Sequence, residues 1–259
     1  MENLSPEAPH LSIAVYPSIG EDQALREVYA TLCEANEVLH SRISLVPVEA
    51  RFESVSDLAD SLHVIDVSGA NVSRLFEEKE GEGFRAVRVQ LLEKTLGVVV
   101  AELSRAEPGE IHPVSVALSA DVLGFPEFLW EREGGYRAFL LGEWARKTLQ
   151  SICDRLDPLY GHLGVEETLP SPSGFREVCD RVRGEFYLSK RLVGVRKDFL
   201  DALTLDYGSG LVSTWHKGFF ICSWPPFGGL GLSDEEARSL EVKVTKFVAE
   251  MLGVGRLGQ

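Results

Sequence analysis

The hydrophobic pattern changes its period several times along the chain, between the alternation typical of strands and the spacing typical of helices. Short apolar or alternating runs predict strands at residues 11–16, 43–48, 87–91, 96–103 and 111–118. The links between the last three runs are too short for a helical crossover, which needs about a dozen residues. These runs therefore predict an antiparallel meander in the middle of the chain.

Three longer segments carry apolar residues at helical spacing and predict amphipathic helices at residues 21–39, 136–156 and 233–252. The last of these has the clearest start, because Ser233 and Glu236 have the spacing of a capping box. Antiparallel strands combined with a few long helices predict an α+β fold, in which the helices pack on one side of the sheet or sheets.

The order of the predicted elements suggests two similar halves that meet near residue 125. The first, residues 1–125, is an acidic α+β half. The second, residues 126–259, is an α+β half that contains both of the later helices and a strand pair at 211–214 and 219–224. A length of 259 residues fits two small domains or one continuous domain, and the sequence leaves both open.

Composition and charge exclude several classes of function. The chain has 40 acidic and 26 basic residues, a net charge of −14, so direct nucleic-acid binding is not expected. Its apolar runs fall far short of the roughly 20 residues of a membrane span, and the first residues lack the features of a secretory signal. These patterns predict a cytoplasmic protein, and its four cysteines are then expected to be reduced thiols. They are Cys33, Cys153, Cys179 and Cys222.

Motifs of catalysis and of metal or cofactor binding are missing from the sequence. The six histidines do not lie three or four residues from one another or from a cysteine, which is the usual zinc spacing. A G-x-G-x-x-G pattern at 253–258 follows a helix, whereas a dinucleotide site needs these glycines between a strand and a helix. We therefore expect no catalytic residues, no metal and no cofactor.

The negative charge is concentrated in the first half of the chain. Residues 1–130 contain 22 acids and 9 bases, a net charge of −13, and the remaining residues have a net charge of −1. The densest acidic run contains Glu77, Glu78, Glu80 and Glu82. Such a run forms either a solvated loop or an acidic face that attracts a basic partner.

Two aromatic segments in the second half are further candidates for partner contacts. One contains Trp215, His216 and Trp224, followed by two prolines, and the other contains Tyr160 and His162 between glycines. Exposed aromatic residues contribute much of the binding energy at interfaces. The alternative is that the first segment completes the core of a hairpin and that the second is a turn after a helix.

The second half resembles bacterial type VI immunity family proteins. The similarity lies in the helix 136–156 and the Leu-x-Pro-x-Tyr-Gly-x-x-Gly turn that ends at Gly164, and again in residues 187–194. The Gly-Leu-Val-Ser-Thr-Trp and Gly-Phe-Phe-Ile strands, with the terminal helix, are similar to polymorphic-toxin immunity proteins. The resemblance covers residues 111–252 and implies no catalytic residues.

The resemblance implies an immunity protein, an antitoxin that binds one cognate toxin of a type VI secretion system and blocks it. A basic toxin would suit the acidic first half. Two other classes stay open: an enzyme whose site is dispersed along the chain, and a structural protein of a phage or secretion machine. A homodimer is also left open.

Overall fold

The computed structural model describes residues 5–58, 61–68, 72–124, 132–177, 185–194, 196 and 198–254. The strands are β1 (His10–Tyr16), β2 (Val38–Pro47), β3 (His63–Ser68), β4 (Phe84–Glu93), β5 (Gly97–Leu103), β6 (Val114–Ser119), β7 (Tyr160–Val165), β8 (Glu185–Ser189), β9 (Val212–Thr214) and β10 (Gly218–Ile221). The helices are α1 (Glu21–Ala35), η1 (Val55–Leu58), α2 (Val72–Gly81), α3 (Asp121–Gly124), α5 (Arg132–Leu156), α6 (Pro172–Glu177), α7 (Lys190–Val193), α8 (Asp198–Tyr207), η2 (Pro225–Phe227) and α9 (Asp234–Val254).

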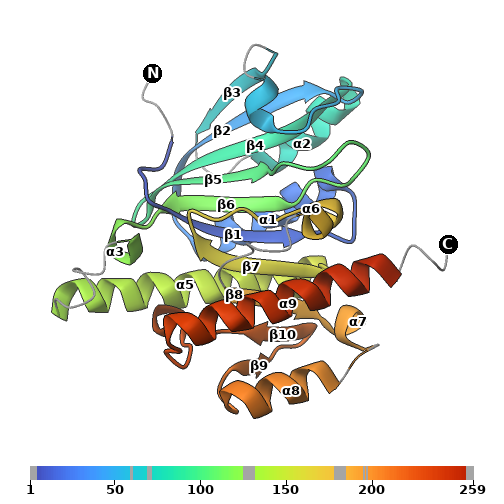
Figure 1. Ribbon diagram of the computed structural model, residues 1–259. Coiled ribbons are helices and arrows are strands. Elements are labelled where there is room, and N and C mark those ends of the chain that lie inside the picture. The colour runs from blue at the N-terminus through green and yellow to red at the C-terminus, as the bar shows by residue number, and fades with distance from the viewer. Residues whose placement is uncertain are drawn as a thin grey trace.

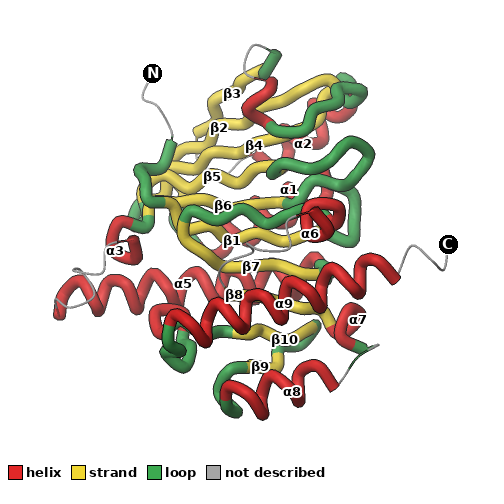
Figure 2. The backbone as a smooth tube through the Cα atoms, viewed as in Figure 1, coloured by secondary structure: helices red, strands yellow, loops and turns green. Residues whose placement is uncertain are grey.

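A single antiparallel sheet runs through the described part of the chain, and its ten strands lie in the order β3-β2-β4-β5-β6-β1-β7-β8-β10-β9 (Figure 1). Strands β4, β5 and β6 pair with their chain neighbours, so the predicted meander is confirmed. Figure 2 shows this continuous sheet together with the helices that flank it. The α+β class predicted from the sequence is therefore confirmed.

The side chains of β1 alternate between two apolar clusters. One row crosses five strands in register and is buried against α1 and α5; it consists of Ile43, Val89, Ala101, Val116 and Ile13. The neighbouring residues Ala14 and Tyr16 belong to a second cluster, with α9 and Leu203 of α8. Successive residues of a strand point to opposite faces of the sheet, so the two clusters lie on opposite faces. The predicted packing on one side therefore holds for α1, α2 and α5, whereas α8 and α9 cover the other face.

The first strand connects the two parts of the sheet. β1 pairs with β6 on one side and with β7 on the other, where Leu11–Tyr16 align with residues 165–160. The sheet therefore continues across the boundary near residue 125. The division into domains at that point stays a prediction.

The segment after the long helix differs from its prediction as a turn, because it forms the interior strand β7. Asp157 has a φ of +46° and lies before Pro158, so the chain leaves α5 and enters the sheet directly. Gly161 permits close pairing, since a Cβ there would lie 2.8 Å from the carbonyl oxygen of Ala14. Gly161 is therefore required by the pairing of β7 with β1, two segments that are far apart in the sequence.

Helix boundaries agree best where local capping determines them. The capping box of α9 is confirmed: the Ser233 amide donates to Glu236 at 3.0 Å, and the Glu236 amide donates to Ser233 Oγ at 3.4 Å. The helix predicted at 21–39 instead ends at Ala35, where Asn36 takes an extended conformation and β2 follows at Val38.

A largely buried ionic cluster connects the start of α1 to the sheet. Glu21 accepts hydrogen bonds from the His112 amide at 2.8 Å and from Arg85 at 2.6 Å, and its carboxylate lies 2.7 Å from His112 Nδ1. Burial acts to raise the pKa of Glu21, but the bonds from His112 and Arg85 outweigh it and lower that pKa to about 2. The folded state therefore favours the ionised carboxylate.

Glu21→Gln is expected to lower the free energy of unfolding at pH 7 by roughly 1–3 kcal/mol, the usual cost of weakening bonds to a charged group. Because the folded pKa lies below the ordinary value, the stabilisation by Glu21 is present above about pH 4.5 and is lost as the pH falls toward 2. Urea unfolding of both chains at pH 7, 5 and 3 measures this difference. A difference that stays constant over this range would contradict the prediction.

Candidate functional site

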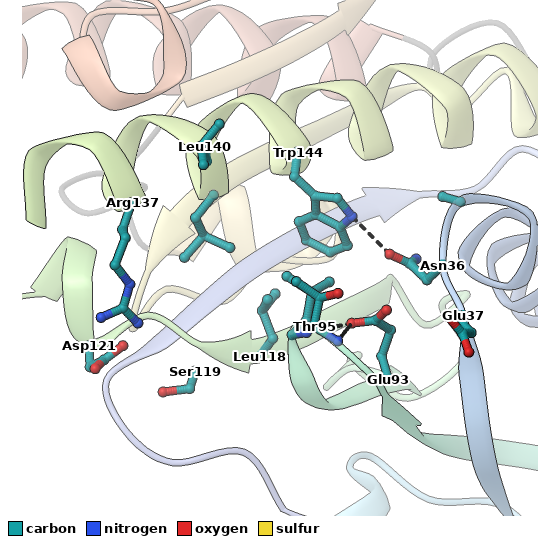
Figure 3. A pocket seen from close by; sticks show the side chains of 13 residues that line it. Asn36, Glu37, Glu93, Thr95, Leu118, Ser119, Asp121, Arg137, Leu140 and Trp144 are labelled. Carbon is teal, nitrogen blue, oxygen red and sulfur yellow. Dashed lines mark hydrogen bonds between the residues drawn. The ribbon is translucent and has the colours of Figure 1, made fainter. Parts of the chain in front are cut away.

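A pocket lies where the end of α1, the β4–β5 turn, the end of β6 and the first part of α5 meet (Figure 3). Its volume is about 590 Å³. The apolar part of the wall includes Leu96, Leu118, Leu141 and Trp144, and the polar part includes Asn36, Glu37, Asp121 and Arg137. Segments that are distant in the sequence thus form one partly apolar hollow.

Trp144 is held in place at one wall of the pocket. Its indole N–H donates to the side-chain oxygen of Asn36 at 3.2 Å, as Figure 3 shows. Asn36 in turn donates from its amide nitrogen to the Leu32 carbonyl at 2.7 Å, which satisfies a free carbonyl at the end of α1. The residue that ends α1 therefore also positions the indole of α5.

The floor of the pocket contains a buried carboxylate that is already committed. Glu93 is 5% exposed and accepts hydrogen bonds from the amides of Thr95, at 2.6 Å, and of Leu96. These bonds hold the tight turn in which Gly97 has a φ of +76°. Glu93 thus shapes the pocket and keeps its β4–β5 edge rigid.

The opposite end of the pocket carries charge. Arg137 extends from α5 toward Asp121, at the start of α3, as Figure 3 shows. Both residues line the pocket together with Glu37, which lies on the α1–β2 link. The arrangement offers apolar walls with charged groups at the rim, and this combination suits the binding of an amphipathic group.

Large apolar side chains are exposed on α5 beside this pocket. Tyr136 is 64% exposed, Phe139 52% and Leu140 44%, and Leu140 also lines the pocket. We call these three residues the α5 patch. Helical spacing in the sequence predicts only the buried stripe of this helix. Apolar residues also occupy positions 136, 139 and 140, outside the stripe that contains Ala138 and Ala145, and they are the sequence signal for this patch.

The predicted acidic run is exposed, at the end of α2 and in the turn to β4. Three of its four glutamates form ion pairs within the chain: Glu78 with Arg74, Glu80 with Arg26, and Glu82 with Lys79, all at 2.6–2.8 Å. These pairs reduce the charge that the run presents to a partner. Whether the run contacts a partner stays a prediction.

Three other candidate residues are buried, which contradicts direct partner contact in this fold. Tyr160 and His162 are both 0% exposed in β7. Trp215 is 7% exposed and stacks on Phe220, with ring centroids 4.6 Å apart. They are core residues because they lie within or next to interior strands. A segment rich in aromatic residues and glycines does not show from its sequence that its strand will lie inside the sheet.

The remaining two candidates stay accessible. His216 is exposed in the β9–β10 turn, with Nδ1 3.8 Å from Asp154. Trp224 is half-buried and packs edge-on against Phe227 in the next turn. The structure therefore separates the nine candidates: the acidic run lies by α2, and these two residues lie near the far edge of the sheet, so they do not form one site.

A buried carboxylate anchors the Trp224 loop. Glu185 is 4% exposed and accepts bonds from the amides of Ser223, at 2.5 Å, and Trp224, at 2.9 Å, and from the Ser223 hydroxyl at 3.0 Å. Burial raises the pKa of Glu185 to about 7, although these hydrogen bonds act to lower it. No local sequence pattern indicates this residue, since its burial depends on β10 and the loop.

A second pocket, of about 300 Å³, lies against β1, β5 and β6 and is lined mostly by residues with polar side chains. Its carboxylates have partners within the chain: Glu166 lies 3.1 Å from His10, and Glu102 accepts a bond from Arg88 at 2.6 Å. This pocket is about half the volume of the pocket at Trp144, and these two carboxylates are already paired.

Cys33, Cys153 and Cys222 are free thiols, and Cys179 and the glycine pattern beyond residue 254 lie outside the described residues. Within the described ranges, no three His, Cys, Asp or Glu side chains are grouped so that they could hold a metal ion.

None of the helices described is both long enough and apolar enough to cross a membrane. No family model, no curated protein and no solved structure matches the chain.

Proposed function

We propose that this protein is an immunity protein, which binds a cognate bacterial toxin of a type VI secretion system in the cytoplasm and neutralises it by covering its functional surface. The observation that carries the proposal is the α5 patch beside the pocket at Trp144. Contiguous exposed apolar side chains with a charged rim are typical of protein-binding surfaces. The resemblance of residues 111–252 to immunity proteins supports the same function.

The charge distribution supports a basic partner. The first 130 residues have a net charge of −13, and their elements include α2 and most of the pocket floor. Opposite potentials accelerate encounter between proteins and orient them before contact. A toxin with a basic active surface, such as a nuclease, would be attracted to this half of the molecule.

The function is tested by growth. A toxin gene adjacent to the gene for this chain is expressed in a susceptible bacterium, alone and together with the chain. The proposal predicts that growth is arrested by the toxin alone and restored by co-expression, and that the two purified proteins form a complex. Restored growth without a complex would point to an enzymatic effect and would overturn the proposal, as would a lack of protection.

Association with the toxin is expected to slow as salt is added, because charge steering is screened beyond about 8 Å at physiological ionic strength. Replacing Glu77, Glu78, Glu80 and Glu82 together by glutamine should reduce the association rate several-fold at low salt, with little change in the dissociation rate. Stopped-flow fluorescence at several salt concentrations measures both rates.

The matched control replaces four exposed acids of the second half, namely Asp198, Asp201, Glu235 and Glu250, by their amides. This variant has the same net charge as the first but keeps the acidic run. Equal effects of the two variants would show that only total charge matters. An association rate that does not respond to salt would remove steering from the proposal.

A further inference from the structure

We propose that the pocket at Trp144 receives an apolar anchor side chain of the toxin, presented on a segment that also carries lysine or arginine. This inference rests on the proposed function and deepens it by assigning the contact site and the chemistry of the bound segment.

The pocket has the size and walls for a large apolar side chain. About 590 Å³ is ample for an aromatic or branched aliphatic group, and Leu96, Leu118 and Trp144 provide apolar contact surface. Energetic anchors at protein interfaces fill pockets of this kind, from which neighbouring contacts exclude water.

The pocket is preformed, which reduces the entropic cost of binding. Trp144 is oriented by its hydrogen bond to Asn36, and the turn at Thr95 is held by Glu93. A side chain that enters the pocket therefore meets walls that are already in position, so little further ordering is required.

The rim favours a cationic neighbour of the anchor. The lining contains three carboxylates, on Glu37, Glu93 and Asp121, and one guanidinium, on Arg137. Glu93 is bonded to the amides of its own turn, and Glu37 forms an ion pair with Lys94 at 2.8 Å. Asp121 is exposed, so a lysine or arginine next to the anchor can approach it. A second copy of this chain is a poor occupant, because each copy has a net charge of −14 and the acidic halves would repel.

The α5 patch extends the contact beyond the pocket. Leu140 belongs to both surfaces, and Tyr136 lies one helical turn before it on the same face. A segment anchored in the pocket can continue over Tyr136 and Phe139, where aromatic contact area is available without further desolvation of charge. Pocket and patch thus form one continuous surface.

The probe is a library of random 12-residue peptides displayed on phage and selected on the intact chain. We expect the enriched peptides to combine an aromatic or large aliphatic residue with a nearby lysine or arginine. Leu140→Lys should weaken their binding at least tenfold, as measured by fluorescence anisotropy with synthetic peptides. Asp121→Lys should remove the preference for a basic residue.

Leu205→Lys is the matched control, because Leu205 is 87% exposed on α8, away from the pocket. It introduces the same charge and should leave peptide binding unchanged, and thermal melting should show that both variants remain folded. The inference is overturned if no peptide is enriched, if the enriched peptides are acidic, or if Leu140→Lys and Leu205→Lys have equal effects. It is also overturned if the chain is a dimer that Leu140→Lys dissociates.

The two proposals fail in different ways. If the chain neutralises a toxin whose binding is unaffected by Leu140→Lys, the function stands and this contact site is wrong. If peptides select the pocket but no adjacent toxin is neutralised, the contact site stands as a protein-binding surface and the immunity function is wrong.

Discussion

Gly142→Ala is expected to destabilise the protein by about 3 kcal/mol, at the upper end of the usual range for overpacked positions. Gly142 lies in the middle of α5, where alanine normally stabilises a helix by up to about 1 kcal/mol. Here a Cβ would lie 1.9 Å from the carbonyl oxygen of Pro226 and 2.6 Å from its carbonyl carbon. Because both atoms belong to the backbone of η2, a side-chain rotation cannot relieve the clash, and helix and loop must separate.

Gly253→Ala is the matched control. Gly253 also lies in a helix, near the end of α9, and a Cβ there would have no neighbour within 4 Å. Its replacement should leave stability unchanged or raise it slightly. Urea unfolding, followed by circular dichroism, compares the two variants with the parent chain. If Gly142→Ala is as stable as Gly253→Ala, α5 and η2 do not approach as closely as described.

The second large effect is the dependence of stability on the ionisation of Glu185. Burial raises the pKa of Glu185 from 4.5 to about 7, so the folded chain binds this proton more tightly than the unfolded chain does. The stabilisation that the proton provides is fully present below about pH 4.5 and is lost as the pH rises to about 7. The difference between the two pKa values corresponds to about 3 kcal/mol.

Glu185→Gln removes this ionisation and keeps the size of the side chain. The free energy of unfolding of the parent chain, minus that of the variant, should therefore fall by about 3 kcal/mol between pH 4.5 and pH 8. Other carboxylates titrate in both chains and cancel in this difference. Denaturant unfolding at five pH values measures it.

Ser223→Ala serves as the control for Glu185→Gln, because it removes one hydroxyl donor but keeps the carboxyl group and the two amide donors. Because that hydroxyl bond acts to lower the pKa of Glu185, the stability of this variant should fall with rising pH at least as much as that of the parent chain. Parallel pH profiles for the parent chain and Glu185→Gln would contradict the raised pKa.

Much of the fold was predictable because its signals are local. Alternation along β4 and the apolar run of β5 predict strands from a few neighbouring side chains. The capping box at Ser233 needs only residues three positions apart. By contrast, the sequence predicts a turn at residues 160–164, and the structure has β7 there. A glycine is needed beside the carbonyl of Ala14 only because β7 pairs with β1, and the local sequence does not show this pairing.

The candidate site was predicted less well than the fold. The hydrogen bond between Trp144 and Asn36 joins residues 108 positions apart and follows from the packing of α5 near the end of α1. The bond from the Thr95 amide to Glu93 is local, but the meeting of this turn with Trp144 in one pocket depends on the tertiary structure. The aromatic residues selected from composition, Tyr160 and Trp215, are buried. Composition indicates that aromatic side chains are present, but it does not indicate which of them stay at the surface.

The sequence by itself determined the α+β class, the main helices and the uneven distribution of charge, because each depends on composition or on residues close together in the chain. Only the tertiary structure decided that β1 joins the two parts of the sheet and that the α5 patch borders a pocket. The burial of a side chain, the close approach of two backbones and the pKa of a carboxyl group depend on which distant segments pack together. The local pattern of side chains does not specify this packing.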